Sequence, residues 1–426
     1  MSERVDGYYN AVIGQGRIGV DPYASFGFSV MGDRMPPNEL AALYMFNGLA
    51  RKVINIPVED ALRNGFTIVD GDKKLVEDSR LQSIVEDLRI VEKLQLALSW
   101  SRLFGGALIV IRAIDGGQLT DELNLNSLKE IEAIEVYEPS KVSTVATYAD
   151  VDSPDYGKPM IYAVSTQTGS FDVHESRTIR LNGEIVTDDE RKSRDGWGGS
   201  VMEYTSGEIM NYNISLRNSL MILQRISQGV LRLNGLTSML STIDGEQAVR
   251  KRLNLIDMAR SIDNTIAIDS EDFYEQHNIS LSGVRDVINE FQIAISAVSN
   301  IPVTRLFGRS PAGQNATGES DMNNYYDFVE GIRNAVVKPI LLRLLQLIDA
   351  AEDYQVTLPQ FYTVEFNPLE QMNEKELADI DKIKADAFKA TVDAFSVLAD
   401  IGAIDTFDVR EALNKQYGFE LEEIEK

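Results

Sequence analysis

The chain offers few side chains that could carry acid–base, metal or nucleophilic chemistry. Its two histidines are His174 and His277, and it contains no cysteine. Without cysteine, disulfides, thiol catalysis and zinc–cysteine sites are excluded. Neither a Walker A sequence nor a G-x-S-x-G sequence occurs, which argues against an ATPase and a serine hydrolase. We therefore expect no enzymatic activity and no bound cofactor.

Two acidic clusters could offer oxygen ligands to a divalent cation. One is Asp188-Asp189-Glu190, and the other is Asp379-Ile380-Asp381. Neither has the glycine-turn spacing of a calcium-binding loop, so we predict no metal site. A metal-dependent nuclease or phosphodiesterase that uses Asp188, Asp189 and Glu190 is the enzymatic alternative.

Residues Gly14-Gln15-Gly16-Arg17-Ile18-Gly19 formally match the dinucleotide-binding pattern G-x-G-x-x-G. That pattern binds a cofactor only where a helix begins within it. Here Val20-Asp21-Pro22-Tyr23 follows, and no helical pattern starts before Asn38. We interpret residues 1–37 as an irregular arm and not as a cofactor site.

The 426-residue chain carries a net charge of −25 and has a pI near 4.5. Affinity for DNA comes mostly from lysine and arginine that neutralise phosphates, so non-specific nucleic-acid binding should be poor. The first thirty residues lack a basic start followed by an apolar run, and we expect no secretory signal. No apolar stretch is long enough to predict a membrane span.

Apolar residues at three- and four-residue steps predict helices, and short alternating runs predict strands. The predicted fold class is α+β and predominantly helical. Pro339 should kink the helix that contains it. Helices are expected at 38–62, 81–104, 207–233, 246–260, 278–299, 319–349, 374–401 and 406–417, and strands at 107–112, within 131–186, at 236–240, 265–268 and 361–366.

Three features between or on these elements could recognise a partner. The segment 300–318 is rich in proline and glycine, so neither helix nor strand is predicted for it. Trp197 lies between glycines in a polar loop and is either an exposed anchor or a lid over the core. The triplet Arg250-Lys251-Arg252 is either a solvated helix face or a docking site for an acidic partner or for phosphates.

The segment 300–318 and the helix after it carry a specific motif. It begins with Ile301-Pro302-Val303, then Arg305-Leu306-Phe307-Gly308, and ends with Gln314-Asn315-Ala316-Thr317-Gly318-Glu319, before a long helix that contains Tyr325-Tyr326 and Pro339. This motif resembles that of the portal proteins of tailed bacteriophages, the head-to-tail connectors. It is most similar to a branch formerly catalogued as a domain of unknown function and related to the N-terminal domains of anti-CBASS phosphodiesterases.

Some members of that branch carry a fused anti-defence phosphodiesterase, which relies on a pair of His-x-Thr motifs. In this chain neither His174-Glu175-Ser176 nor His277-Asn278-Ile279 matches such a motif. The resemblance therefore implies the portal part and not the phosphodiesterase.

The resemblance implies a portal fold with wing, stem, clip and crown regions. These regions are expected at 1–37 (N-terminal arm), 38–206 (α/β wing), 207–233 (stem helix), 234–277 (clip), 278–299 (stem helix), 300–318 (tunnel loop), 319–370 (kinked long helix and wing return strand) and 371–426 (helical crown).

It also implies a ring, commonly a dodecamer, at the capsid vertex of the virion, assembled in the host cytoplasm. The ring would conduct double-stranded DNA and would dock the large terminase, the head–tail adaptor and the major capsid or scaffolding protein. An acidic lining would repel phosphates and let the duplex slide; alternatively, the negative charge serves only solubility. The non-enzymatic alternative is a head-assembly scaffold without a channel.

Within the implied tunnel loop, Arg305 and Arg309 are the only charges between Ile301 and Gly318. They could touch phosphates, while the neutral side chains Gln314, Asn315 and Thr317 offer hydrogen bonds. Alternatively, Arg305 caps the preceding helix or pairs with an acid on a neighbouring subunit. Leu306 and Phe307 should pack beneath the loop. In the implied clip, Arg250, Lys251 and Arg252 would dock a partner.

Overall fold

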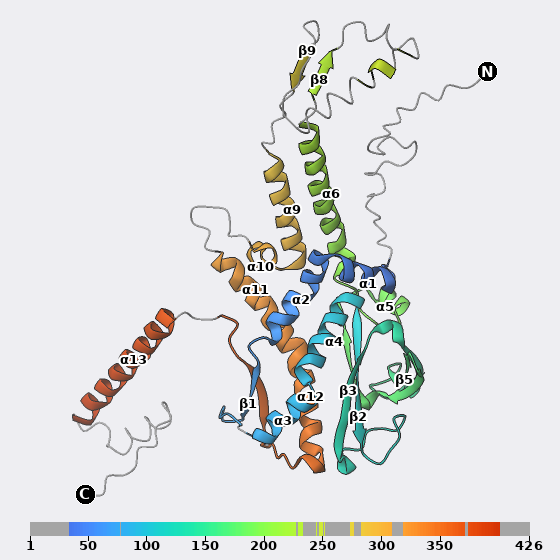
Figure 1. Ribbon diagram of the computed structural model, residues 1–426. Coiled ribbons are helices and arrows are strands. Elements are labelled where there is room, and N and C mark those ends of the chain that lie inside the picture. The colour runs from blue at the N-terminus through green and yellow to red at the C-terminus, as the bar shows by residue number, and fades with distance from the viewer. Residues whose placement is uncertain are drawn as a thin grey trace. The chain divides into compact units, whose positions relative to one another are not determined.

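The computed structural model describes residues 34–76, 78–226, 229–232, 244, 247–249, 251, 273–276, 283–308, 318–370 and 374–400. The chain divides into two units, Met1–Asn367 and Pro368–Lys426. The helix α13 (Glu374–Asp400) belongs to the second unit. The mixture of many helices with several small sheets confirms the predicted α+β class (Figure 1).

The elements of the first unit follow one another in three stretches. Up to Phe104 the chain forms α1 (Pro37–Phe46), α2 (Gly48–Leu62), β1 (Phe66–Asp70), α3 (Ser79–Asp87) and α4 (Ile90–Phe104). Six strands follow: β2 (Gly106–Ile114), β3 (Glu130–Tyr137), β4 (Val142–Thr147), β5 (Pro159–Thr166), β6 (Gly169–His174) and β7 (Thr178–Asn182), with short 3-10 turns at Leu125–Ser127, Pro139–Lys141 and Glu175–Arg177. The rest comprises α5 (Asp188–Ser193), α6 (Met202–Ile226), β8 (Gly229–Arg232), β9 (Phe273–Gln276), α9 (Val284–Ser299), α10 (Val303–Phe307), α11 (Glu319–Ile332), a π-helical segment (Arg333–Val337), α12 (Lys338–Ala350), a 3-10 turn at Glu352–Tyr354 and β10 (Tyr362–Phe366).

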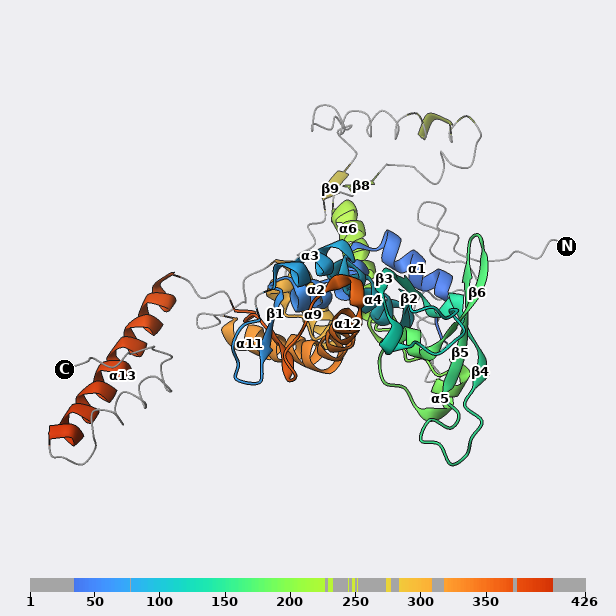
Figure 2. The ribbon, with the colours of Figure 1, turned by 90° about the horizontal axis from the view of Figure 1, so that it is seen from below.

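Strand β2 is the centre of the core, because both of its faces are buried. It pairs antiparallel with β3 on one side and with β7 on the other. Its alternating residues Ala107, Ile109 and Ile111 face the main apolar core, which includes residues of α4 and α12. The residues between them, Leu108 and Val110, pack against the second sheet, β4-β5-β6. In Figure 2, β2 and β3 accordingly lie between α4 and β5.

The two glycines in the turn between α4 and β2 leave room for the Trp197 side chain in this core. Gly105 ends α4 with a left-handed φ of 82°, which glycine adopts without strain. A Cβ atom added to Gly106 would lie 2.2 Å from the Trp197 ring, so this position requires glycine. Trp197 is buried, and the Arg180 guanidinium stacks over its ring at 3.8 Å. Of the two interpretations of Trp197, the lid over the core is therefore the one observed.

Helices α6 and α9 pack along each other as an antiparallel hairpin (Figure 1). Gln292 Nε2 on α9 donates a hydrogen bond to Tyr212 Oη on α6 at 3.3 Å. Beyond the hairpin, β8 pairs antiparallel with β9, so Gly229 lies opposite Gln276. Strand β1 pairs antiparallel with β10, which joins residues as far as 300 positions apart in the chain, such as Phe66 and Phe366.

The helix predicted over 38–62 is two helices. Asn47 leaves the helical conformation, and its side chain accepts hydrogen bonds from the backbone N–H groups of Leu49 and Ala50. An asparagine in this position caps a helix start more favourably than it extends a helix. Asn38, where the predicted helix begins, lies inside α1, which starts at Pro37.

Other predicted boundaries also shift. The helix over 81–104 is split at Arg89, whose φ is 52°, into α3 and α4. The helix over 207–233 begins earlier, at Met202, and ends at Ile226, because Gly229–Arg232 pairs as a strand with β9. The helix over 278–299 starts only at Val284, after Gly283 with φ 91°.

Two predictions near the loop are also corrected. The segment 300–318, expected to hold no helix, contains α10, because Pro302 presets the backbone for a helix start. The long helix is interrupted by the π-helical segment Arg333–Val337 directly before Pro339, where the missing proline N–H disturbs regular hydrogen bonding. The predicted elements at 236–240, 265–268 and 406–417 lie outside the described residues.

Candidate functional site

The candidate site is the anchor that fixes the segment 300–308 to the body of the first unit. Asn300 turns the chain out of α9 with a left-handed φ of 55°, and the Ser296 hydroxyl donates to the Ile301 carbonyl at 2.6 Å. Ile301 is fully buried. The chain is therefore redirected by a defined turn before α10 begins.

Helix α10 packs through its apolar residues. Leu306 is fully buried, and the Phe307 ring contacts the Tyr212 ring of α6 edge-on, with centroids 5.7 Å apart. The ammonium of Lys52 on α2 donates to the Leu306 carbonyl at 2.9 Å, which satisfies one of the free carbonyls at the helix end. Leu306 and Phe307 therefore pack against the body of the first unit, as predicted, while residues 309–317 of the loop lie outside the described residues.

A buried carboxylate joins α10 to α2 and α11. Asp60 on α2 is only 1% exposed. Arg305 binds it in a bidentate manner, with Nε 3.1 Å from Oδ2 and Nη2 2.9 Å from Oδ1. Tyr325 of α11 donates its hydroxyl to Oδ2 at 2.7 Å, and Arg63 Nη1 lies 3.2 Å from Oδ1. We call these four residues the Asp60 cluster.

The environment of the Asp60 cluster shifts two pKa values. The hydrogen bond from Arg305 to Asp60 raises the pKa of the Arg305 guanidinium, so this cation stays charged. Burial, and then the hydrogen bond to Asp60, raises the pKa of Tyr325 far above its usual value. The phenol therefore stays neutral and keeps donating, and the arrangement can hold three helices together but offers no acid or base.

Arg333 stabilises the same region from the other side. This arginine is fully buried in the π-helical segment. Its guanidinium donates to the backbone carbonyl of Ala61 at 2.8 Å, to that of Asn367 at 2.9 Å and to the Glu330 carboxylate at 2.7 Å. It thus caps the last turn of α2 and ties it to the end of β10.

Of the other sequence-predicted site residues, the structure describes only Lys251. Arg309, Gln314, Asn315 and Thr317 lie outside the described residues, as do Arg250 and Arg252. Lys251 is exposed and helical. The sequence left three roles open for Arg305: contact with DNA, a cap on the preceding helix, or an ion pair with an acid of a neighbouring subunit. Its acidic partner in the structure is Asp60 of its own chain.

Sequence reasoning missed Asp60, Tyr325 and Arg333 as a group. For Asp60 and Arg333, the sequence signal is a charged residue at a helix position where the three- and four-residue spacing predicts a buried apolar side chain. Asp60 follows Val53 and Ile56 at such steps, and Arg333 follows Val329. A charge in such a position is buried only when it is paired and hydrogen-bonded, so each one points to a partner elsewhere in the chain.

Two of the side chains considered for metal or catalytic chemistry, Glu190 and His174, have partners within the chain. Asp188, Asp189 and Glu190 form the first turn of α5, where negative charges interact favourably with the helix dipole. Glu190 Oε1 lies 2.8 Å from Arg194 Nη2. His174 Nδ1 lies 2.9 Å from the Ser176 hydroxyl in a tight turn. Among the described residues, no group of three or more His, Asp or Glu side chains could hold a metal ion.

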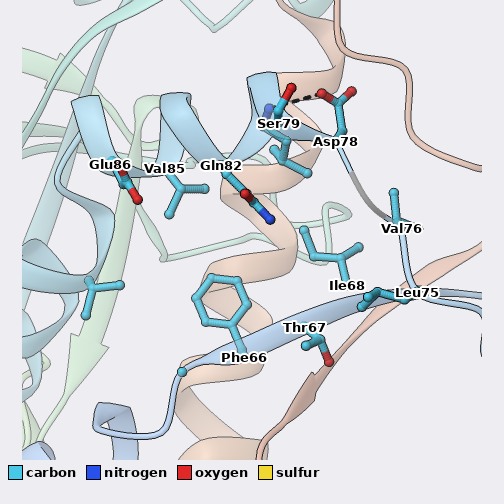
Figure 3. Close-up of a pocket in the computed structure, with 13 residues that line it drawn as sticks. Phe66, Thr67, Ile68, Leu75, Val76, Asp78, Ser79, Gln82, Val85 and Glu86 are labelled. Atoms are coloured by element: carbon cyan, nitrogen blue, oxygen red, sulfur yellow. Dashed lines mark hydrogen bonds between the residues drawn. The ribbon is translucent and has the colours of Figure 1, made fainter.

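A cavity of about 720 Å³ lies between α3 and β1 (Figure 3). Phe66 and Ile68 of β1 and Val85 of α3 line it, and Asp78, Gln82 and Glu86 border it. Its lining contains no histidine and no lysine or arginine. It therefore offers a largely apolar surface without a cationic side chain that could hold an anion.

Comparison with known proteins identifies the family. Residues 38–390 match the sequence model of the family described as Phage portal protein. The chain belongs to this family. This match confirms the resemblance found in the loop motif and shows that it holds over residues 38–390 of the portal protein.

Two curated relatives are anti-CBASS proteins. The portal protein is 27% identical over 385 residues to anti-CBASS protein Acb1 of Caulobacter sp. (strain RHG1), which covers 87% of the chain and 60% of the relative. Anti-CBASS protein Acb1 of Sphingomonas paeninsulae is 24% identical over 409 residues, with 93% and 63% covered. The portal protein thus spans less than two thirds of the length of these relatives.

A solved structure of the neck of an empty GTA particle matches with a TM-score of 0.48 and 14% sequence identity. The match covers 89% of this chain and 94% of the other.

Within the part of the portal protein that the structure describes, no helix has the length and apolar character needed to cross a membrane.

Proposed function

We propose that the chain is one subunit of a ring, with twelve copies as the expected number, which occupies a capsid vertex and conducts double-stranded DNA during packaging and ejection. The observation that carries this proposal is a set of exposed apolar side chains along the α6–α9 hairpin, which we call its outward side. They are between 36% and 61% exposed: Met210, Leu216 and Leu220 on α6, and Val287 and Ile293 on α9.

Two packed helices need only one apolar face each, so these outward residues have no role in the isolated hairpin. Burial of one such side chain is worth about 1.5–3 kcal/mol. A closed ring buries them, because each subunit offers one side of its hairpin to the next copy and the other side to the previous copy. The ring thereby accounts for exposed apolar residues on both helices with a single kind of contact.

In this proposal the segment 309–317 borders the channel. Arg305 anchors its base through Asp60, while Arg309, Gln314, Asn315 and Thr317 meet passing DNA by weak, sequence-independent contacts to phosphates. The chain's net charge of −25 opposes tight binding of the duplex. The protein then acts by electrostatics and conformational change and not by catalysis.

The residues between β8 and β9 belong to the proposed clip. Arg250, Lys251 and Arg252 would dock the large terminase during packaging and the head–tail adaptor afterwards. Triple replacement by glutamate should leave rings intact and abolish adaptor binding in a pull-down. Rings that still retain the adaptor would show that the triplet is only a solvated helix face.

Negative-stain imaging of the purified chain over a range of salt concentrations tests the ring itself. We expect annular particles with a central hole. A compact monomer under every condition would exclude the portal ring and leave the non-channel scaffold as the better account.

A deletion tests the channel role separately. Removal of residues 310–317 leaves α10 and the Asp60 cluster in place, so rings should form normally. In infected or complemented cells the same deletion should reduce the number of DNA-filled heads. Loss of the ring itself would mean that the segment serves assembly and not DNA passage.

A further inference from the structure

The junction of α1 and α2 exposes two large apolar side chains next to each other. Met45 is 65% exposed and Phe46 is 84% exposed, both in the last turn of α1. Ala42, also exposed, lies on the same side of the helix at the three- and four-residue steps. We call Ala42, Met45 and Phe46 the elbow patch.

The elbow patch exists because the helix breaks at Asn47. In an unbroken helix over 38–62, Phe46 would fall on the apolar stripe that contains Leu43, Leu49 and Val53. The Asn47 cap starts a new helix instead, and Phe46 remains outside the core. An exposed phenylalanine forgoes about 2 kcal/mol of burial, so the break does not serve the stability of the isolated chain.

The charge around the patch is unusual for this molecule. Residues 41–52 contain Arg51 and Lys52 and no aspartate or glutamate, which gives a local net charge of +2 in a chain of −25. Both basic residues are exposed, and Arg51 also lies over the Tyr44 ring at 5.1 Å. An apolar surface bordered by positive charge fits a partner that is apolar and acidic.

We propose that a second copy of this chain covers the elbow patch. The copy carries a net charge of −25, so a patch bordered by positive charge attracts it electrostatically. A ring contact joins two different faces of adjacent copies, and the elbow patch is one such face, separate from the outward side of the α6–α9 hairpin. This inference rests on the proposed ring.

The absence of cysteine in the chain makes the contact directly testable. In Phe46→Cys, a thiol-reactive benzophenone can be attached at one position only and then activated by light in the assembled protein. We expect denaturing gels to show dimers and higher multimers, and peptide mapping to identify the attachment point. Lys158→Cys, whose parent side chain is 62% exposed in a polar loop, is the matched control and should remain monomeric.

A second variant measures the contribution of the contact. Phe46→Ala should fold normally but require about tenfold more protein to form rings, since burial of a large aromatic side chain often dominates an interface. Phe361→Ala removes another highly exposed phenylalanine and should have a smaller effect.

The outcomes separate the two proposals. Rings by imaging together with only intramolecular attachment, for instance to residues 1–33 of the same chain, would overturn the elbow contact and leave the ring intact. No ring under any condition would overturn both. Attachment to any residue of a second copy supports the elbow contact.

Discussion

The Asp60 cluster and the α6–α9 hairpin differ in how their energetically costly residues are accommodated. In the cluster, a fully buried carboxylate finds its partners within the same chain. In the hairpin, apolar side chains such as Leu220 and Ile293 remain exposed. The first region is complete within one chain, and in the proposed ring the second is completed by a neighbouring copy.

This difference separates folding from assembly. A buried ion pair adds little net stability, but removal of one partner leaves an uncompensated group and is costly. An exposed apolar side chain costs the monomer little and stabilises only what covers it. Changes in the cluster should therefore act on the isolated subunit, while changes on the hairpin should act on the ring.

The largest effect is expected for Asp60→Ala. It leaves the buried Tyr325 hydroxyl without its acceptor and Arg305 without its bidentate partner, so the free energy of unfolding should fall by about 3 kcal/mol. Urea unfolding followed by the fluorescence of Trp100 and Trp197 measures it. Asp72→Ala, at an exposed position, should change stability by less than about 0.5 kcal/mol. Equal behaviour of the two variants would contradict a structural role for the cluster.

Arg333→Met should have the next largest effect. Methionine keeps the apolar part of the side chain but leaves the carbonyls of Ala61 and Asn367 without their charged donor. We expect a loss of about 2 kcal/mol, measured by the same unfolding experiment. Arg89→Met removes an arginine from an exposed ion pair and should be nearly neutral. If Arg333→Met matched that control, the cap on α2 would be unimportant.

Much of the fold could be predicted from the sequence, because periodic apolar residues mark helices and strands directly. The long helices and the strand β2 were found this way. Their ends were missed where a local competitor acts, such as the Asn47 side chain, the left-handed Arg89 or the pairing of Gly229–Arg232 with β9. These choices depend on single hydrogen bonds or on distant strands, which periodicity does not report.

The site was harder to predict than the fold. The loop motif pointed to the right segment and the right family, but the partner of Arg305 lies 245 positions earlier in the chain. Only the three-dimensional packing of α2, α10 and α11 reveals that Asp60 meets both Arg305 and Tyr325. A sequence shows that a buried charge needs a partner, but it does not say which one.

A pair of matched variants on α9 tests the comparison most directly. Ile293 is half exposed, whereas Ile295, two positions on, is fully buried. Ile293→Asn should leave unfolding unchanged within about 0.5 kcal/mol but raise about tenfold the concentration at which rings form. Ile295→Asn should destabilise the subunit itself. Native mass spectrometry measures the first effect and urea unfolding the second, and a loss of subunit stability in Ile293→Asn would contradict the assembly role.

The smallest effect is a pH dependence that belongs to the cluster alone. Tyr325→Phe removes one hydrogen bond to Asp60 and should cost about 1 kcal/mol at neutral pH. The folded protein holds the pKa of Tyr325 above its value in the unfolded chain, so this contribution is fully present below about pH 10. Above that pH the unfolded phenol ionises while the folded one does not, and the stability of the unmodified protein should fall by an additional amount, approaching about 1.4 kcal/mol per pH unit.

Tyr325→Phe should lack this additional slope, whereas Tyr156→Phe, at an exposed position, should retain it. The same slope in both variants would show that Tyr325 ionises freely, and the cluster would then not be sealed from solvent within a single subunit.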